Sequence, residues 1–75
     1  MELTITQDTD FGEALRKAEL AGEATFTAET DLLREQISNL LDLRNWNFVY
    51  HAESYEVYRK EGDTATIRLM ADTIH

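Results

Sequence analysis

The 75-residue sequence contains no cysteine, no proline and only three glycines. Without cysteine the chain can have no disulfide framework, no thiolate zinc site and no cysteine nucleophile. No apolar run approaches the ~20 residues of a membrane-spanning helix, and the first residues lack the basic and apolar regions of a signal peptide. We therefore expect one small cytoplasmic domain over residues 1–75 that does not associate with a membrane.

Basic residues are also scarce: seven stand against fifteen acidic ones, so the formal net charge is -8. A hydrophobic content of 43% is ordinary for a globular domain, and so the charge does not indicate disorder. Residues 1–37 hold nine acids and three bases, whereas residues 38–75 hold six acids and four bases. This excess argues against direct nucleic-acid binding, which depends on phosphate attraction, and favours a basic partner.

Hydrophobic periodicity predicts a strand, a helix and a second strand in the N-terminal part of the chain. Residues 3–6 alternate between apolar side chains and threonine, as in a half-buried strand. Asp10 is the expected N-cap of the first helix, with Glu13 placed to complete a capping box. Gly22 is the expected residue at the end of this helix, and residues 24–28 alternate again.

A second helix is predicted between the N-cap Thr30 and Arg44, with a wide apolar stripe. Three β-like segments follow, at residues 46–50, 55–59 and 65–71. The turn between the last two is predicted at residues 60–63, with Gly62 at the permissive position. The predicted order is β-α-β-α-β-β-β, an α+β two-layer sandwich with two helices on one face of a small, mainly antiparallel sheet.

Aromatic residues gather in the first two of these three segments. They are Trp46, Phe48, Tyr50, Tyr55 and Tyr58. Alternation predicts that Trp46, Phe48 and Tyr50 share one face, with Trp46 and Phe48 in the core beneath the helices. Aromatic and cationic side chains on a sheet can also bind single-stranded nucleic acid, but the net charge opposes that interpretation.

The sequence predicts no catalytic, cofactor or metal site. His51, Glu53 and Ser54 lie together, but a serine nucleophile also needs an oriented base and oxyanion donors, and we interpret the segment as a polar turn. His51, Glu53 and His75 are possible metal ligands, without the three or four supported ligands typical of zinc sites. Gly12 is isolated, so no glycine-rich phosphate loop is present.

The leading hypothesis is a non-enzymatic acidic protein that occupies a basic, nucleic-acid-binding surface of another protein. In size, charge and lack of catalytic motifs the chain resembles small inhibitors encoded by phages and mobile elements, including anti-CRISPR and anti-restriction proteins. Acids would mimic phosphates, while tyrosine and arginine, which are enriched in interface hot spots, would strengthen the contact. The predicted partner-binding residues are Glu13, Glu19, Glu23, Glu29, Asp31, Glu35, Tyr55, Tyr58 and Arg59.

Part of the acidic excess has a local explanation, because acids favour helix N-termini and Glu13 can pair with Lys17 four residues on. Two other functions remain open. An antitoxin or small regulatory homodimer would use the leucine-rich second helix or a sheet edge as its interface. A housekeeping domain of a halophile would use its acids for hydration, and five arginines, two lysines and nine threonines fit that composition.

Overall fold

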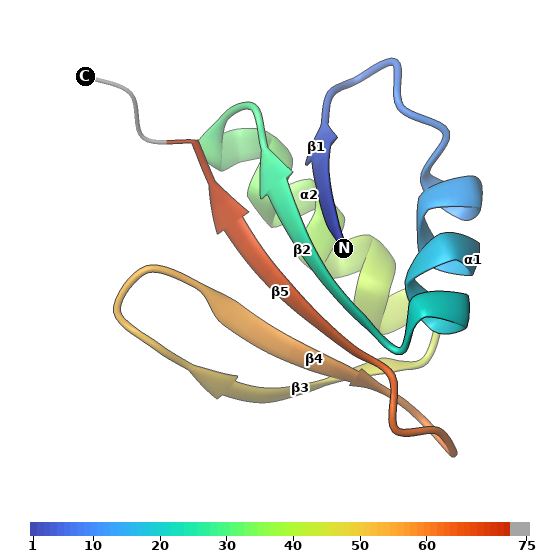
Figure 1. Ribbon diagram of the computed structural model, residues 1–75. Coiled ribbons are helices and arrows are strands. Elements are labelled where there is room, and N and C mark those ends of the chain that lie inside the picture. The colour runs from blue at the N-terminus through green and yellow to red at the C-terminus, as the bar shows by residue number, and fades with distance from the viewer. Residues whose placement is uncertain (73–75) are drawn as a thin grey trace.

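Figure 1 shows the computed structural model, which describes residues 1–72. Seven elements follow one another in the predicted order, which confirms the α+β class and the two-helix, five-strand composition. They are β1 (Glu2–Ile5), α1 (Phe11–Ala21), β2 (Glu23–Ala28), α2 (Asp31–Leu43), β3 (Trp46–His51), β4 (Glu56–Lys60) and β5 (Thr66–Ala71). Within the described residues no helix is both long and apolar enough to cross a membrane.

The ends of the helices lie where the cap residues predict them. The Asp10 carboxylate accepts a hydrogen bond from the Glu13 backbone N–H at 3.2 Å, and the Thr30 hydroxyl accepts one from the Leu33 N–H at 3.1 Å. Each bond satisfies one of the N–H groups that a helix leaves without an internal partner. Gly22 ends α1 in the left-handed conformation, with φ of 80°.

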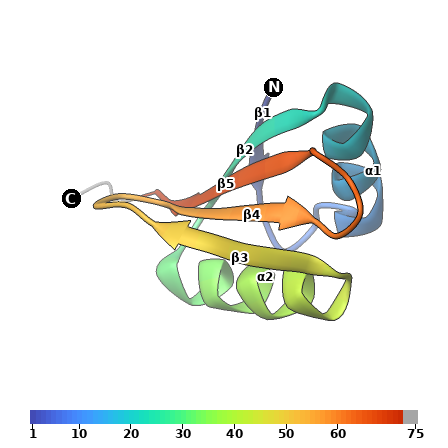
Figure 2. The same cartoon turned by 90° about the horizontal axis from the view of Figure 1, so that it is seen from below.

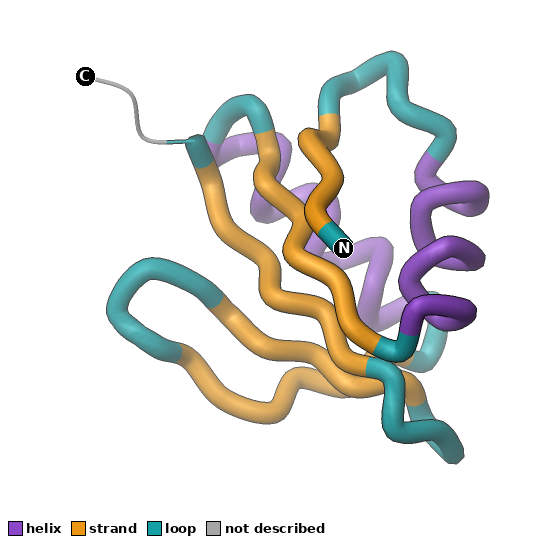
Figure 3. Tube along the Cα trace, in the orientation of Figure 1, coloured by secondary structure: helices purple, strands orange, loops and turns teal. Residues whose placement is uncertain are grey.

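The five strands form one sheet in the order β1-β2-β5-β4-β3. The expected antiparallel pairing holds for β4 with both of its neighbours, whereas β2 pairs in parallel with β1 and β5. β1, β2 and β3 therefore run in one direction, and both helical crossovers step toward the β3 edge. Crossovers of the same hand that step in the same direction put α1 and α2 on one face of the sheet (Figures 2 and 3).

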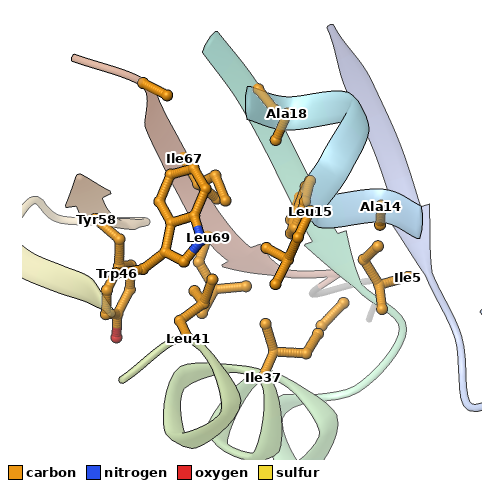
Figure 4. Close-up of a cluster of buried hydrophobic side chains, with 14 residues drawn as sticks. Ile5, Ala14, Leu15, Ala18, Ile37, Leu41, Trp46, Tyr58, Ile67 and Leu69 are labelled. Carbon is orange, nitrogen blue, oxygen red and sulfur yellow. The ribbon is translucent and has the colours of Figure 1, made fainter. Parts of the chain in front are cut away.

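The core lies between that face and the two helices. Side chains from α1 and α2 point toward one another and toward the sheet (Figure 4). The core residues are Ile5, Ala14, Leu15, Ala18, Ala24, Phe26, Ala28, Ile37, Leu41, Trp46, Tyr58, Ala65, Ile67 and Leu69. No helix within the described residues covers the opposite side of the sheet, which we call the open face.

A β-bulge changes the predicted face of β3. Phe48 pairs with Tyr58 and Tyr50 with Val57, so Val49 is an extra residue between the two pairs. The alternation shifts by one position there, and Tyr50 lies on the open face with Val57. The prediction that Tyr50 shares a face with Trp46 and Phe48 is therefore wrong.

The core position expected for Phe48 is wrong as well. Trp46 is fully buried as predicted, but Phe48 lies at the outer edge of the sheet and remains 54% exposed. Tyr58, on the inner strand β4, enters the core instead and is only 3% exposed. The Phe48 ring rests edge-on against the Tyr58 ring, with centroids 5.8 Å apart.

Candidate partner-binding surface

Two of the predicted partner-binding acids on α1 pair with cations of the same chain. Glu13 binds Arg16 at 2.7 Å, three residues away, rather than Lys17 as predicted. This hydrogen bond raises the pKa of the Arg16 guanidinium. Glu19 lies 3.3 Å from the ammonium of Lys60, which also donates to the backbone carbonyl of the residue after α2. Both carboxylates therefore have a role within the fold.

Asp31 belongs to a small charge network at the start of α2. Its carboxylate lies 2.9 Å from Nε of Arg34, while Nη1 of the same arginine lies 2.7 Å from Glu56 on β4. The hydrogen bond that Arg34 donates to the Asp31 carboxylate is the main cause that raises the pKa of Arg34. Arg34 thus connects the helix to the sheet, and Asp31 still faces solvent.

The remaining predicted acids, Glu23, Glu29 and Glu35, are exposed and make no ion pair within residues 1–72. Glu23 begins β2 and Glu29 follows the end of that strand. A strand of this length spans ~20 Å, so these two acids lie at opposite ends of the sheet. The structure does not bring all the predicted acids onto one face.

One side of α2 does carry a row of acids. Asp31, Glu35 and Asp42 are all exposed, and their spacing of four and seven residues puts them on one side of the helix together with Ser38. We call Asp31, Glu35 and Asp42 the α2 acid row. Asp42 was missed by the sequence analysis, although its position seven residues after Glu35 is a signal that helical spacing could have used.

The α2 acid row faces the β3–β4 side of the molecule. Ser38, in the same row, forms a hydrogen bond with the Tyr58 hydroxyl of β4. Burial raises the pKa of that hydroxyl, and the nearby charge of Asp42 also acts to raise it. In Figure 2, α2 extends along β3, which it contacts.

The row also spans the length of β3. At one end, Asp31 lines a surface pocket together with His51 and Glu53, at the C-terminal end of the strand. At the other end, the Asp42 carbonyl accepts a hydrogen bond at 3.2 Å from Asn45, the residue before β3. The part of α2 that carries the three acids therefore runs alongside β3 from one end of the strand to the other.

β3 forms an edge of the sheet, and its outer side pairs with no strand of residues 1–72. Five of its six residues are exposed. The exposed fraction is 54% for Phe48, 43% for Val49 and 48% for Tyr50, and the strand contains no lysine, arginine or acid. We call this strand and its unpaired outer side the β3 edge.

The predicted aromatic and cationic contacts are divided between the core and the open face. Tyr58 is buried and so cannot contact a partner, which corrects its assignment to the binding surface. Tyr55 is half-buried beneath the Arg68 guanidinium, 5.3 Å from the ring centroid, and rests edge-on against Tyr50 at 6.5 Å. Arg59 is exposed on the open face, so Tyr55 and Arg59 lie on a different side of the sheet from α2.

The segment considered for catalysis or metal binding is a surface turn. His51, Glu53 and Ser54 are exposed at the β3–β4 connection. No cluster of three or more His, Asp or Glu side chains in the described part of the chain could hold a metal ion. His75 lies outside the described residues.

Comparison with protein-family models, with curated proteins and with solved structures finds no match to this chain. Function is therefore inferred from the surface formed by the α2 acid row and the β3 edge. Its most distinctive feature is that an acid row and an unpaired, aromatic strand edge lie next to each other.

Proposed function

We propose that this chain is a non-enzymatic acidic protein that binds a basic surface of another protein, of the kind that otherwise binds nucleic acid. The observation that supports the proposal is the α2 acid row, three exposed carboxylates on one side of a helix. At 1.5 Å per residue the row is ~16 Å long, which is enough to contact several cations of one partner. The proposal implies a location in the cytoplasm, where such partners act.

The rest of the charge distribution fits this proposal. Four of the fifteen acids, Glu13, Glu19, Asp31 and Glu56, are ion-paired. The remaining eleven make no ion pair within residues 1–72, and none of the acids is buried. The negative electrostatic field of these acids attracts basic surfaces over several ångströms and raises the rate of encounter with them by ~10- to 1000-fold.

Besides the acids, we propose that side chains on the open face of the sheet contact the partner. Tyr55 and Arg59 remain candidates on the open face, and the exposed Tyr50 is added to them. Aromatic and arginine side chains of this kind supply a large share of the affinity at protein interfaces. The protein would thereby act as an inhibitor of the type that phages and mobile elements direct against defence systems, including anti-CRISPR and anti-restriction proteins.

A small regulatory homodimer is the second candidate, and one observation favours it. Leu32 and Leu43 are 66% and 77% exposed on α2, and their spacing puts them on one side of the helix. In a dimer these two leucines would be covered by the second copy. Sedimentation analysis at micromolar concentration separates the candidates, because the dimer hypothesis requires a molecular mass twice that of the chain.

The proposed function is tested by capture of partners with the tagged full chain from lysate of a candidate host. We expect the captured proteins to be basic nucleic-acid-binding proteins that duplex DNA or RNA displaces. Raising NaCl from about 0.05 M to about 0.5 M should release them, because the attraction is screened. Capture that is equally strong at both salt concentrations would contradict the proposal.

The matched variant is the triple substitution Glu23→Lys, Glu29→Lys and Glu35→Lys. None of these acids has an ion pair within the described residues, so the fold should tolerate their reversal. We expect captured protein to fall at least about tenfold, equivalent to about 1.4 kcal/mol. The control, Lys17→Glu, makes the chain more acidic and should retain or increase capture.

A further inference from the structure

We infer that an extended basic segment of the partner pairs with the β3 edge as a sixth strand and places alternate Lys or Arg side chains against the α2 acid row. This inference rests on the proposed function and specifies how the basic partner is held. It joins two neighbouring features, an unpaired strand edge and a row of negative charge along it.

The backbone of β3 is open to pairing with a further strand. An edge strand presents a line of N–H and C=O groups that another strand can pair with, and proteins usually protect such edges with charges, proline or shortness. β3 has six residues, contains neither proline nor any Lys, Arg, Asp or Glu, and carries the exposed Phe48, Val49 and Tyr50. Its only protective device is the bulge at Val49, and so it remains suited to addition of a strand.

A strand added to β3 matches the α2 acid row in length and in the spacing of its side chains. A strand of six residues is ~20 Å long, and its alternate side chains on one face are ~6.7 Å apart. On α2, Asp31 and Glu35 are ~6 Å apart along the helix axis, and the whole row is ~16 Å long. A partner segment with basic residues at every second position can therefore direct two or three of them toward the row.

The surface between β3 and α2 offers an aromatic ring to the side chains of an added strand. Phe48 lies on the helix side of β3, half-exposed, with its ring edge-on against Tyr58. The aliphatic stems of Lys or Arg can cover this ring while their charged ends reach the acids. The other side chains of the added strand would lie on the open face beside Tyr50, where β-branched or aromatic residues fit best.

A second copy of this chain fits the site less well. Its own β3 reads Trp-Asn-Phe-Val-Tyr-His and brings no lysine or arginine to neutralise the α2 acid row. Pairing of two β3 edges would also put two chains of charge -8 side by side, with both acid rows on the same face of the joined sheet. Charge complementarity therefore selects a basic occupant.

The test uses two synthetic peptides with the same composition, one alternating lysine and threonine and one with its lysines in a single block. We expect the full chain to bind the alternating peptide at least about tenfold more tightly at low salt, measured by fluorescence anisotropy. Backbone amides of β3 should gain protection from hydrogen exchange on binding, while those of β1 should not. Equal affinity for the two peptides, or protection elsewhere only, would overturn the inference.

Two pairs of variants locate the contact. Val49→Lys puts a charge on the β3 edge, and Thr4→Lys adds the same charge to the other edge strand, β1. Glu35→Lys with Asp42→Lys reverses the acid row, whereas Glu2→Lys with Asp8→Lys makes the same change in net charge on β1 and in the turn that follows it. The first member of each pair should weaken binding at least about tenfold and the second less than about threefold. Thermal melts verify that each variant is folded.

The outcomes separate the inference from the proposed function. If every variant pair weakens binding equally, the chain attracts basic molecules through net charge alone, and only the inference fails. If neither peptide binds but the lysate capture remains salt-sensitive, the inference also fails by itself. A doubled molecular mass that Val49→Lys abolishes would show a second copy on β3 and overturn it too. Loss of salt-sensitive capture as well as peptide binding would overturn both.

Discussion

The two edge strands of the sheet are built in opposite ways. β1 has four residues, of which Leu3 and Ile5 turn toward the core while Glu2 and Thr4 face outward. β3 has six residues and exposes three large apolar side chains with no charge among them. One edge is short, charged and held by burial, as is usual for an edge that should stay unpaired. The other lacks these protections and has an acidic helix beside it, and for this reason we propose it as the edge that a partner strand binds.

The largest expected effect on stability tests how tightly each edge strand packs against the rest of the fold. Ile5 is 2% exposed within the core, so Ile5→Ala should lower the free energy of unfolding by about 2–5 kcal/mol. Val49 is the half-exposed bulge residue of β3, so Val49→Ala should cost less than about 1 kcal/mol. Urea denaturation of both variants measures the two losses. Losses of similar size would show that β3 is as tightly packed as β1.

A smaller effect concerns the ion pair that holds α2 against the β3 side of the sheet. Arg34 is 24% exposed and bridges Asp31 and Glu56, so Arg34→Gln should cost about 1 kcal/mol. Arg16, which is 65% exposed in its pair with Glu13, gives the matched control, because Arg16→Gln should cost less stability than Arg34→Gln. Added salt should change the first loss less than the second, since partly buried pairs are less screened. The reverse order would contradict this view of how the helix is held.

An effect no larger than that of Arg34→Gln at neutral pH is expected from Tyr58, which packs beneath Phe48 on the β3 side. Burial raises the pKa of Tyr58 in the folded protein above its ordinary value. Its contribution to stability is therefore complete below about pH 10 and is lost as the pH rises through the raised value. Tyr58→Phe should cost about 1 kcal/mol near pH 8, through loss of the bond to Ser38, and should reduce the decline above pH 10.

Urea midpoints measured between about pH 8 and about pH 11 test this prediction. The wild-type midpoint should fall more steeply above about pH 10 than that of the variant. Parallel declines in the two proteins would assign the alkaline sensitivity to other groups. The β3 side would then owe none of its pH dependence to the buried hydroxyl.

The sequence was sufficient for the class, the order of elements and the helix caps, because these depend on local patterns. Asp10, Gly22 and Thr30 each act on backbone groups a few residues away, and alternation fixes a strand wherever one face is buried. The bulge at Val49 left no such signal, since Phe48, Val49 and Tyr50 are consecutive apolar or aromatic residues. Shifting the alternation by one position changes no obvious pattern there, and Tyr50 was misplaced for that reason.

The candidate surface was only partly predictable. Helical spacing allows Glu13 to reach either Arg16 or Lys17, and local geometry selects the first. The acid row needed only that same spacing, applied as far as Asp42. That the row lies beside β3 depends on the sheet order, and the insertion of β5 between β2 and β4 joins residues some 40 positions apart.

The central position of β5 also has a consequence for how the chain folds during synthesis. β5 is the latest described strand to emerge from the ribosome, yet it pairs with both β2 and β4 and supplies Ile67 and Leu69 to the core. Until it emerges, the β1–α1–β2 unit and the β3–β4 hairpin have no strand between them to complete one sheet. The single sheet can therefore be completed only after β5 has emerged.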